Sequence, residues 1–276
     1  NELLTPLNFT NTTPTTQTIF VRVENLTTEC FKAIALPLIV NPLPVIIQPV
    51  PLELCDDAVA DQITIFDLTD KNLEITNSDG SLEVVYYTTL LDAENATNAI
   101  ADPTTYTNTA IGTAAANPQT LHVRVTDLDT GCYDLTTLTI RVLPNPTPNI
   151  NPHNLTACDD TNSGDGIEVF DLTTYETLIV NGEGNVSPTY HQSLEDALDG
   201  LNAIPNPTNY SNTETPLQTI YVRVTNDLTA CFTVLDFDLI VNPIPNAIAI
   251  DDFIACELNT DDVYDFDLES QSSLIL

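Results

Sequence analysis

The sequence is poor in basic residues, and this shortage excludes whole classes of partner. Only 6 of its 276 residues are Lys or Arg, against 40 Asp and Glu, which gives a formal net charge of −34. Nucleic acid backbones are bound by clustered Lys and Arg, so nucleic acid is excluded as a partner. Anionic membrane surfaces require the same basic residues and are excluded for the same reason. Divalent cations are the partners that such an acidic chain attracts.

Long hydrophobic runs are missing as well. No apolar run approaches the ~20 residues needed to cross a bilayer, so we do not expect this chain to span a membrane. The chain begins without Met and without a secretory signal, and we therefore expect it to be an internal piece of a longer, processed protein. A packed core is still expected, because 42% of the residues are hydrophobic and recur in short alternating runs.

The sequence also lacks a recurring catalytic set. The three histidines, His122, His153 and His191, are surrounded by different residues and occupy different places in the sequence pattern. A nucleophile, a histidine and an acid therefore cannot be assembled from residues that recur. We do not expect this chain to be an enzyme.

What the sequence does contain is a repeat of about 100 residues. TIFVRVEN, TLHVRVTD and TIYVRVTN each centre on an arginine, FDLT recurs as FDLT and FDLE, and VNPLP, LPNPTP and VNPIP form proline-rich junctions. A period of this length indicates tandem domains rather than a solenoid of short units. We expect complete repeats at 45–147 and 148–245. The C-terminal half of a repeat would precede them at 1–44, and the N-terminal part of another would follow at 246–276.

The local patterns within a repeat predict an almost entirely β structure. Short runs rich in Val, Ile, Thr and Tyr are bounded by Asn, Asp, Gly and Pro, which is typical of strands. One short helix per repeat is expected, at 91–100 and at 194–204. The predicted fold class is all-β, with tandem immunoglobulin-like or fibronectin type III-like β-sandwich repeats of about 100 residues.

The recurring arginines are expected to be structural. Alternation along the first of these strands places Ile19, Val21 and Val23 on the core face and Arg22 on the other face. The expected partners of the recurring arginines are carboxylates of the FDL motif, because a guanidinium group can bind a carboxylate through two parallel hydrogen bonds. An exposed arginine that binds a ligand is the alternative. The proposed ion-pair residues are Arg22, Arg124, Arg223, Asp67, Asp171 and Asp267.

Six cysteines at regular positions, with no C-x-x-C spacing, are typical of an oxidised extracellular protein rather than a zinc site. Two pairing schemes are sensible. In the first, Cys55–Cys132 and Cys158–Cys231 staple each repeat internally, and Cys30 and Cys256 pair with residues outside this chain. In the second, Cys30–Cys55, Cys132–Cys158 and Cys231–Cys256 clamp neighbouring repeats. We favour the first, because a bridge that closes a loop of ~75 residues stabilises a domain by roughly 4 kcal/mol.

Acidic clusters follow three of the cysteines, in CDDAVADQ, CDDTNSGDG and CELNTDD. The second cluster loosely resembles a calcium-binding loop, although its spacing is one residue too long and no Glu ends it. Calcium is therefore one interpretation, and a solvated Asp-rich turn is the other. The candidate ligands are Asp56, Asp57, Asp159, Asp160, Asn162, Asp165, Asp261 and Asp262.

Several linked motifs carry a resemblance to a known group of proteins. FDLT, YHQSLEDALDGLNAIPNPTNYSNT, TIYVRVTNDLTACF and LIVNPIP, at their matching spacing, resemble the tandem repeats of giant cell-surface proteins of Bacteroidota, especially flavobacteria. These include SprB-like gliding-motility adhesins and other substrates of the type IX secretion system. The resemblance implies export across the outer membrane, attachment at the cell surface and extension as an adhesive filament.

Two functions are compatible with these features. The first is an extracellular structural and adhesive stalk, anchored to the outer membrane through regions outside this chain. Its partners would be a surface polysaccharide or another cell-surface protein. The second is an array of ancillary, non-catalytic modules in a secreted enzyme that degrades polysaccharide. The near-identity of the repeated motifs favours the stalk.

Overall fold

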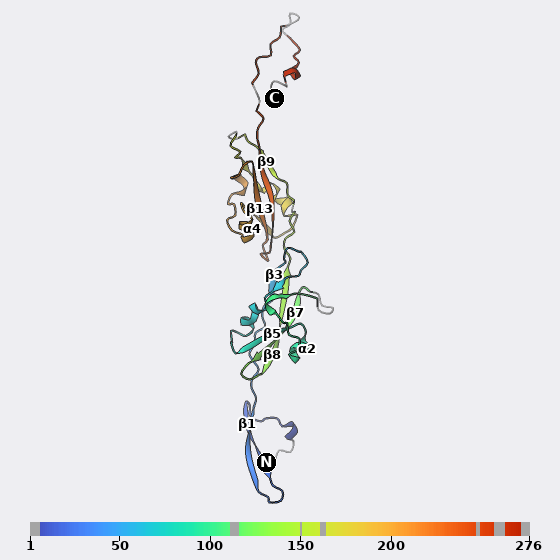
Figure 1. Ribbon diagram of the computed structural model, residues 1–276, viewed down its shortest axis with the longest axis vertical. Helices are drawn as coiled ribbons and strands as arrows, with labels where there is room; N and C mark the ends of the chain where they lie inside the picture. Colours follow the sequence, from blue (N-terminus) through green and yellow to red (C-terminus); the bar gives the residue numbers. More distant parts are fainter. Residues whose placement is uncertain are drawn as a thin grey trace. The chain divides into compact units, whose positions relative to one another are not determined.

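The computed structural model describes residues 6–110, 116–149, 151–160, 164–246, 249–256 and 263–271. The chain divides into two compact units, 1–144 and 145–276. Each unit contains one complete repeat, and the two repeats have the same order of strands and short helices (Figure 1).

The first unit contains a hairpin followed by a complete repeat. The hairpin pairs β1 (Thr16–Glu24) with β2 (Phe31–Ile39) and follows the short 3-10 helix η1 (Pro6–Asn8). The elements of the repeat are β3 (Leu52–Cys55), β4 (Ile65–Phe66), η2 (Leu68–Lys71), α1 (Asn72–Ile75), β5 (Leu82–Tyr87), α2 (Leu90–Asn95), η3 (Pro103–Thr105), β6 (Tyr106–Thr107), β7 (Gln119–Asp127) and β8 (Tyr133–Leu143). Its main sheet has the order β3-β8-β7-β5, with β3 parallel to β8 and the other pairs antiparallel.

The second unit repeats this plan. Its elements are β9 (Leu155–Cys158), β10 (Val169–Phe170), η4 (Leu172–Tyr175), α3 (Glu176–Ile179), β11 (Val186–His191), α4 (Leu194–Asp199), η5 (Pro207–Asn209), β12 (Tyr210–Ser211), β13 (Leu217–Asn226), β14 (Phe232–Asn242) and η6 (Leu268–Gln271). The main sheet has the order β11-β13-β14-β9, and the β9–β14 pair is parallel. A two-stranded ladder, β4–β6 in one repeat and β10–β12 in the other, forms part of the second layer.

Strict alternation along the central strands builds the core. Leu121, Val123 and Val125 of β7 are fully buried, and so are their counterparts Ile220 and Val222 of β13. In the first repeat they pack with residues of β8 and of the β4–η2 segment. In the second repeat they pack with residues of β14 and of the β10–η4 segment, so in both repeats the second layer closes the sandwich. Burying such side chains is the main favourable term in folding.

The predicted all-β fold of tandem sandwich repeats is confirmed, with the second layer reduced to a short ladder and short helices. The predicted helix of each repeat is α2 or α4. The sequence pattern missed α1 and α3, because a four-residue helix is too short to show a hydrophobic period.

The hairpin β1–β2 shows what the same strand sequence does without a second layer. Val21 is 38% exposed and Val23 is 62% exposed, whereas Val123 and Val125 are fully buried. This face of the hairpin therefore remains open to solvent over much of its area. The core prediction therefore holds in the complete repeats and fails in the hairpin, because an apolar strand face is buried only where another layer packs on it.

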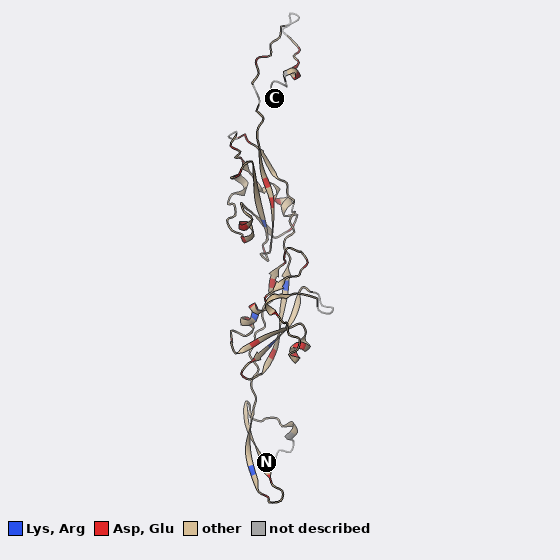
Figure 2. Cartoon of the chain, viewed as in Figure 1, with Lys and Arg blue, Asp and Glu red and all other residues tan. Residues whose placement is uncertain are grey.

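Figure 2 shows that basic residues are sparse along the described chain and that acidic residues outnumber them. Among the described residues, no helix is long and apolar enough to cross a membrane.

Candidate functional sites

In the two complete repeats, the recurring arginine binds the C-terminal end of a helix. The Nη1 atom of Arg124 donates hydrogen bonds to the carbonyl oxygens of Ala93 and Glu94, at 3.1 and 3.0 Å, in the last turn of α2. Its guanidinium carbon lies 3.3 Å from the centre of the Tyr133 ring. The last carbonyls of a helix have no hydrogen-bond partner within the helix. A cation at this end also interacts favourably with the negative end of the helix dipole.

Arg223 repeats this arrangement in the second repeat. Its Nη1 atom donates to Ala197 and Leu198 of α4, at 2.9 and 2.6 Å, and its guanidinium lies 3.3 Å from the centre of the Phe232 ring. Partial burial lowers the pKa of Arg223, and the nearby Asp199 partly offsets this effect.

The predicted ion pairs with the FDL carboxylates are therefore wrong. Asp67 and Asp171 instead act as N-caps: each accepts a hydrogen bond at 2.9 Å from a backbone amide, that of Thr69 in η2 or Thr173 in η4. Asp267 directly precedes η6 and forms no ion pair with an arginine among the described residues. An aspartate two residues before a threonine is a typical capping pattern. Its carboxylate bonds the nearby backbone amide rather than an arginine far away in the sequence.

Arg22 has no helix to bind. It forms an ion pair with Glu24 at 2.9 Å and lies 4.0 Å from the centre of the Phe31 ring. The aromatic residue that directly follows the hairpin cysteine in all three copies was the sequence signal for this stacking. It lies diagonally across the antiparallel pair from the arginine, where long side chains can meet.

The cysteines do not follow either predicted pairing. Cys55 and Cys231 are disulfide-bonded. The free thiols are Cys30, Cys132, Cys158 and Cys256. Both schemes need Cys132 and Cys158 to be bonded, so Cys55–Cys132 and Cys158–Cys231 are wrong, and so are Cys30–Cys55, Cys132–Cys158 and Cys231–Cys256.

Sheet topology explains why the favoured internal bridges fail. Cys55 lies beside Leu143, at the C-terminal end of β8, because β3 pairs in parallel with that strand. Cys132 directly precedes Tyr133, at the other end of β8. An eleven-residue strand is roughly 35 Å long, whereas the Cα atoms of a disulfide lie about 4.4–6.8 Å apart. The same topology separates Cys158 from Cys231, since Cys158 pairs with Asn242 at the end of β14.

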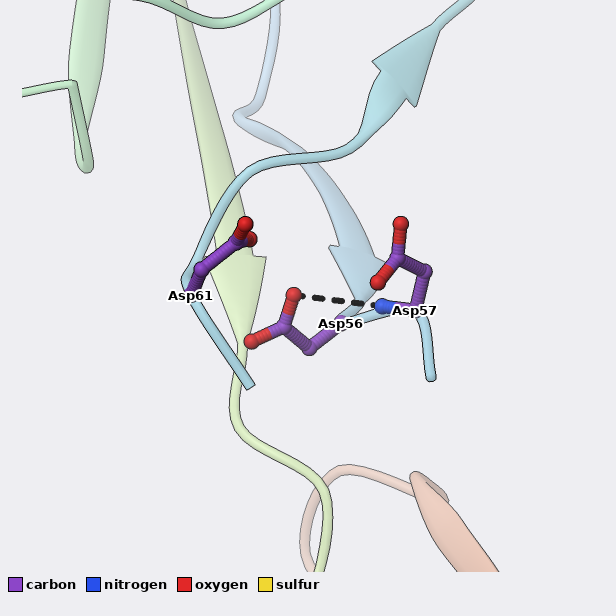
Figure 3. A group of neighbouring side chains, drawn as sticks. All are labelled: Asp56, Asp57 and Asp61. Carbon is purple, nitrogen blue, oxygen red and sulfur yellow. Dashed lines mark hydrogen bonds between the residues drawn. The ribbon is translucent and has the colours of Figure 1, made fainter. Parts of the chain in front are cut away.

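The acidic loop after β3 brings three carboxylates together (Figure 3). Asp56, Asp57 and Asp61 each have a carboxylate oxygen within 4.8 Å of the others. Asp56 is 9% exposed, and the other two side chains are exposed. Backbone amides of the loop orient these groups: Asp57 and Gln62 donate to the two oxygens of Asp56, at 3.1 and 3.0 Å.

The equivalent loop after β9 contains a buried carboxylate oxygen without a donor. Asp159 is 6% exposed, and its Oδ2 atom accepts a hydrogen bond from the amide of Gly164 at 2.8 Å. Its Oδ1 atom is buried and has no hydrogen-bond partner. Glu168, also 6% exposed, accepts from the amide of Asp160 at 2.9 Å. Of the other candidate ligands, Asp165 accepts from the amide of Ile167, whereas Asn162, Asp261 and Asp262 lie outside the described residues.

His191 was not recognised from sequence as part of the core. It is fully buried, with Nδ1 2.8 Å from the carbonyl of Leu201 and Nε2 2.9 Å from the hydroxyl of Thr189. A histidine placed between a carbonyl and a hydroxyl holds the chain after α4 against β11. Its role is therefore structural.

The second repeat also has a shallow, uncharged pocket of about 270 Å³. Side-chain amides and hydroxyls line much of it, and a tyrosine contributes a ring. The polar lining residues are Gln192, Asn202, Asn206, Asn209, Tyr210 and Ser211. Nothing in the sequence pattern pointed to this pocket.

Comparison with solved structures finds multidomain chains of low sequence identity. Titin domains I67–I69 (an E-to-A variant) are 8% identical, with 82% of this chain and 75% of that chain covered and a TM-score of 0.29. Drosophila N-cadherin EC1–4 is 11% identical, with 83% and 59% covered and a TM-score of 0.22. Mouse clustered PcdhgC3 EC1–3 is 15% identical, with 85% and 78% covered and a TM-score of 0.21. Likeness at this level carries no inference about function.

Comparison with curated proteins gives no match. A protein-family profile, in contrast, matches the chain at residues 1–44, 51–148 and 154–245. Its description names a disulfide bond, and disulfide-bonded cysteines are typical of secreted proteins. Since these three matches together cover most of the sequence, the chain belongs to the Flavobacterium inter-domain disulphide bond domain family.

Proposed function

We propose that this chain is part of an extracellular stalk in which disulfide bonds join successive repeats. The observation that carries the proposal is the state of the six cysteines: Cys55 and Cys231 are disulfide-bonded and the other four are free. Each of these two shares its repeat with a free cysteine, so neither takes part in a bridge within its own repeat. The family is itself named for an inter-domain disulfide.

The repeat pattern suggests a rule for the proposed links, in which the first-strand cysteine of one repeat bonds the hairpin cysteine of the next. Cys55 ends the first strand of its repeat, and Cys231 lies in the final hairpin of the next repeat. In an array that continues in both directions, Cys158 would pair with the hairpin cysteine of a following repeat. Cys132 would pair with the first-strand cysteine of a preceding repeat. Each junction would then carry a covalent link besides the proline-rich linker, which suits a protein that bears tension.

The recurring polar residues support a scaffold rather than an enzyme. The arginines bind helix carbonyls, and the FDL aspartates cap 3-10 helices. Each of these groups is engaged by its own repeat, so none is held ready for a substrate. We therefore propose that the chain is not catalytic and that its role at the cell surface is structural and adhesive.

Peptide mapping without reduction tests the pairing. The expected result is a peptide pair that links Cys55 to Cys231, lost in Cys55→Ser and kept in the matched variant Cys132→Ser. Recovery of Cys55 linked to Cys132 or to Cys30 would contradict the proposal. Alkylation before digestion should label Cys30, Cys132, Cys158 and Cys256 in this chain.

Adhesion needs a separate test on cells. Cells that lack these repeats should attach less to surfaces coated with polysaccharide, and antibody against the repeats should label intact cells. Within the chain, the amide-lined pocket is the candidate contact for a neutral sugar. Asn206→Ala with Asn209→Ala should weaken retention on a polysaccharide column if this pocket binds. If the full-length gene instead encodes a hydrolase domain beside these repeats, the ancillary-module alternative is correct.

A further inference from the structure

We propose that the open face of the β1–β2 hairpin binds residues 263–271 of a second copy of this chain, which we call the tail segment. The hairpin is the final hairpin of a repeat, since the family profile matches 1–44 separately and β1 pairs with β2 as β7 pairs with β8. The tail segment contains FDLE, a copy of the FDL motif. The inference goes beyond the proposed stalk and does not depend on the disulfide pairing.

The open face of the hairpin is the first observation. Val23 and Leu36 are 62% and 44% exposed, whereas their counterparts in the first complete repeat, Val125 and Leu138, are fully buried. Leu36 lies opposite Ile19 in the ladder, so it shares a face with the alternate residues of β1, Val23 included. This face therefore has the apolar pattern of a core layer without the burial of one.

The complete repeats show which segment covers this face. In the first repeat, Phe66 and Leu68 of the FDL motif are fully buried in one cluster with Val125. In the second repeat, Phe170 and Leu172 are 5% and 1% exposed and belong to the equivalent cluster. The FDL motif, with the 3-10 helix that it begins, is therefore a part of the repeat that closes this face.

The copy of this motif in the tail segment has exposed apolar side chains. Phe266 is 42% exposed and Leu268 is 73% exposed. The motif already has the local conformation of its counterparts, because η6 begins at the leucine of the motif, as η2 and η4 do. One chain therefore presents both an open core face and an open covering segment, and burying each against the other would be favourable.

Charge favours the same partner. The hairpin contains Arg22 and Lys32, two of the six basic residues of the chain, and the place of Lys32 in the ladder puts it on the open face. The tail segment carries Asp265, Asp267 and Glu269 and no basic residue. Opposite charges steer these two surfaces together, whereas the acidic surfaces elsewhere repel another copy.

A second copy, rather than the same chain, is the occupant that we infer. Two complete repeats and their proline-rich junctions separate the hairpin from the tail segment in the sequence. Closure within one chain has to bend these junctions, and the effective concentration of a tethered partner falls with the length of the tether. A separate chain meets no such constraint. Because the hairpin and the tail segment are different surfaces, the contact is heterologous and adds chains head to tail.

Analytical ultracentrifugation of the whole chain tests the proposal, with reductant present so that disulfide-linked dimers do not form. We expect the average mass to rise with concentration between about 1 and 200 μM, where weak interfaces associate. Val23→Thr with Leu36→Thr should weaken association by about tenfold or more, while threonine keeps the preference for a strand. Leu128→Thr with Leu228→Thr is the matched control, since these leucines are exposed and lie in turns outside both surfaces.

Phe266→Thr with Leu268→Thr in the tail segment should weaken association by the same factor. These changes lie outside the described strands, so this variant decides the matter even where the hairpin variant disturbs strand pairing. A mixture of the two variants gives the sharpest readout. One intact hairpin then meets one intact tail segment, so the mixture should form dimers and stop there, although each variant alone stays monomeric.

A mass of one chain at every concentration would overturn the proposal, and this includes the case in which the tail segment covers its own hairpin. Equal weakening in the control variant would also overturn it. So would a mixture of the two variants that stays monomeric.

Discussion

Arg124 and Arg223 show how a single side chain can connect two elements of a repeat. Each arises from the central strand, stacks on an aromatic ring of the adjacent strand and binds two carbonyl oxygens at the end of a helix. Only a flat group with several fixed N–H donors can stack and donate at once. This requirement explains why an acidic chain retains an arginine at this point of each repeat.

Arg223→Lys is expected to destabilise the second repeat by about 1–2 kcal/mol, because lysine loses the stacking and one of the two carbonyl bonds. Arg22→Lys is the matched control and should change stability by less than about 0.5 kcal/mol, since Arg22 makes only an exposed ion pair beside a ring. The difference in stability between the two variants is measured by denaturant unfolding, monitored through hydrogen exchange in peptides of the second repeat. Equal effects of the two substitutions would contradict the helix-binding role.

The residue that ends each helix differs between the repeats, and the difference gives a second prediction. Ala96 follows α2 with a φ of 52°, whereas Gly200 follows α4 with a φ of 68°. The left-handed region is unfavourable for alanine and open to glycine. Ala96→Gly should therefore stabilise the first repeat by about 0.5–1 kcal/mol, after allowance for the greater freedom of glycine in the unfolded chain.

Gly200→Ala is the reciprocal change and should destabilise the second repeat by a similar amount. A Cβ atom at this position would meet the guanidinium of Arg223 at 3.5 Å, an ordinary contact, so backbone conformation decides the effect. The same exchange experiment measures both variants. Stabilisation by Gly200→Ala would show that the φ values do not control stability here.

At the scale of elements, the short helices α2 and α4 depend on one carboxylate each. Asp92 accepts hydrogen bonds from the hydroxyl of Thr89, the N-cap of α2, and from the side-chain amide of Asn98 beyond the end of the helix. Asp196 repeats this with Ser193 and Asn202 in α4. Each carboxylate ties the two ends of its helix together, which allows a six-residue helix to persist.

These contacts make the helices sensitive to acid. Hydrogen bonds from Thr89 and Asn98 lower the pKa of Asp92 below its ordinary value, so its contribution to stability is present above the ordinary pKa. That contribution is lost as the pH falls through the lowered value. Stability of the first repeat, measured by denaturant unfolding, should drop below about pH 4. Asp92→Asn should be less stable at neutral pH and should lose less on acidification; an unchanged pH dependence would contradict this role.

At the scale of the whole molecule, stability comes from apolar burial within each repeat rather than from ion pairs. The ion pairs among the described residues are Arg22–Glu24, Lys71–Glu74 and Arg141–Glu53. Partly exposed pairs of this kind contribute little. Each repeat instead has its own core of buried residues from both layers.

Reduction should therefore leave both repeats folded. Neither Cys55 nor Cys231 forms a bridge within its own repeat, because the other cysteine of each repeat is free. Amide hydrogens of β7–β8 and of β13–β14 are expected to remain protected from exchange after a strong reductant is added. Loss of protection in one repeat on reduction would show that a disulfide, rather than the core, holds that repeat together.

The sequence by itself determined the features that depend on neighbouring residues along the chain. The repeat period, the alternation that buries Val123 and Val222, and the position of each arginine opposite the core face could all be derived from local pattern, because strand geometry has a period of two. The acidic loops could also be located, since they directly follow cysteines.

Only the tertiary structure decided which distant groups meet. The parallel pairing of β3 with β8 places Cys55 and Cys132 at opposite ends of one strand, and no spacing rule reveals this. The arginines bind carbonyl oxygens of a helix some 30 residues earlier, a backbone acceptor that carries no residue signature. The unsatisfied oxygen of Asp159 likewise follows from burial, which depends on the packing of the whole repeat.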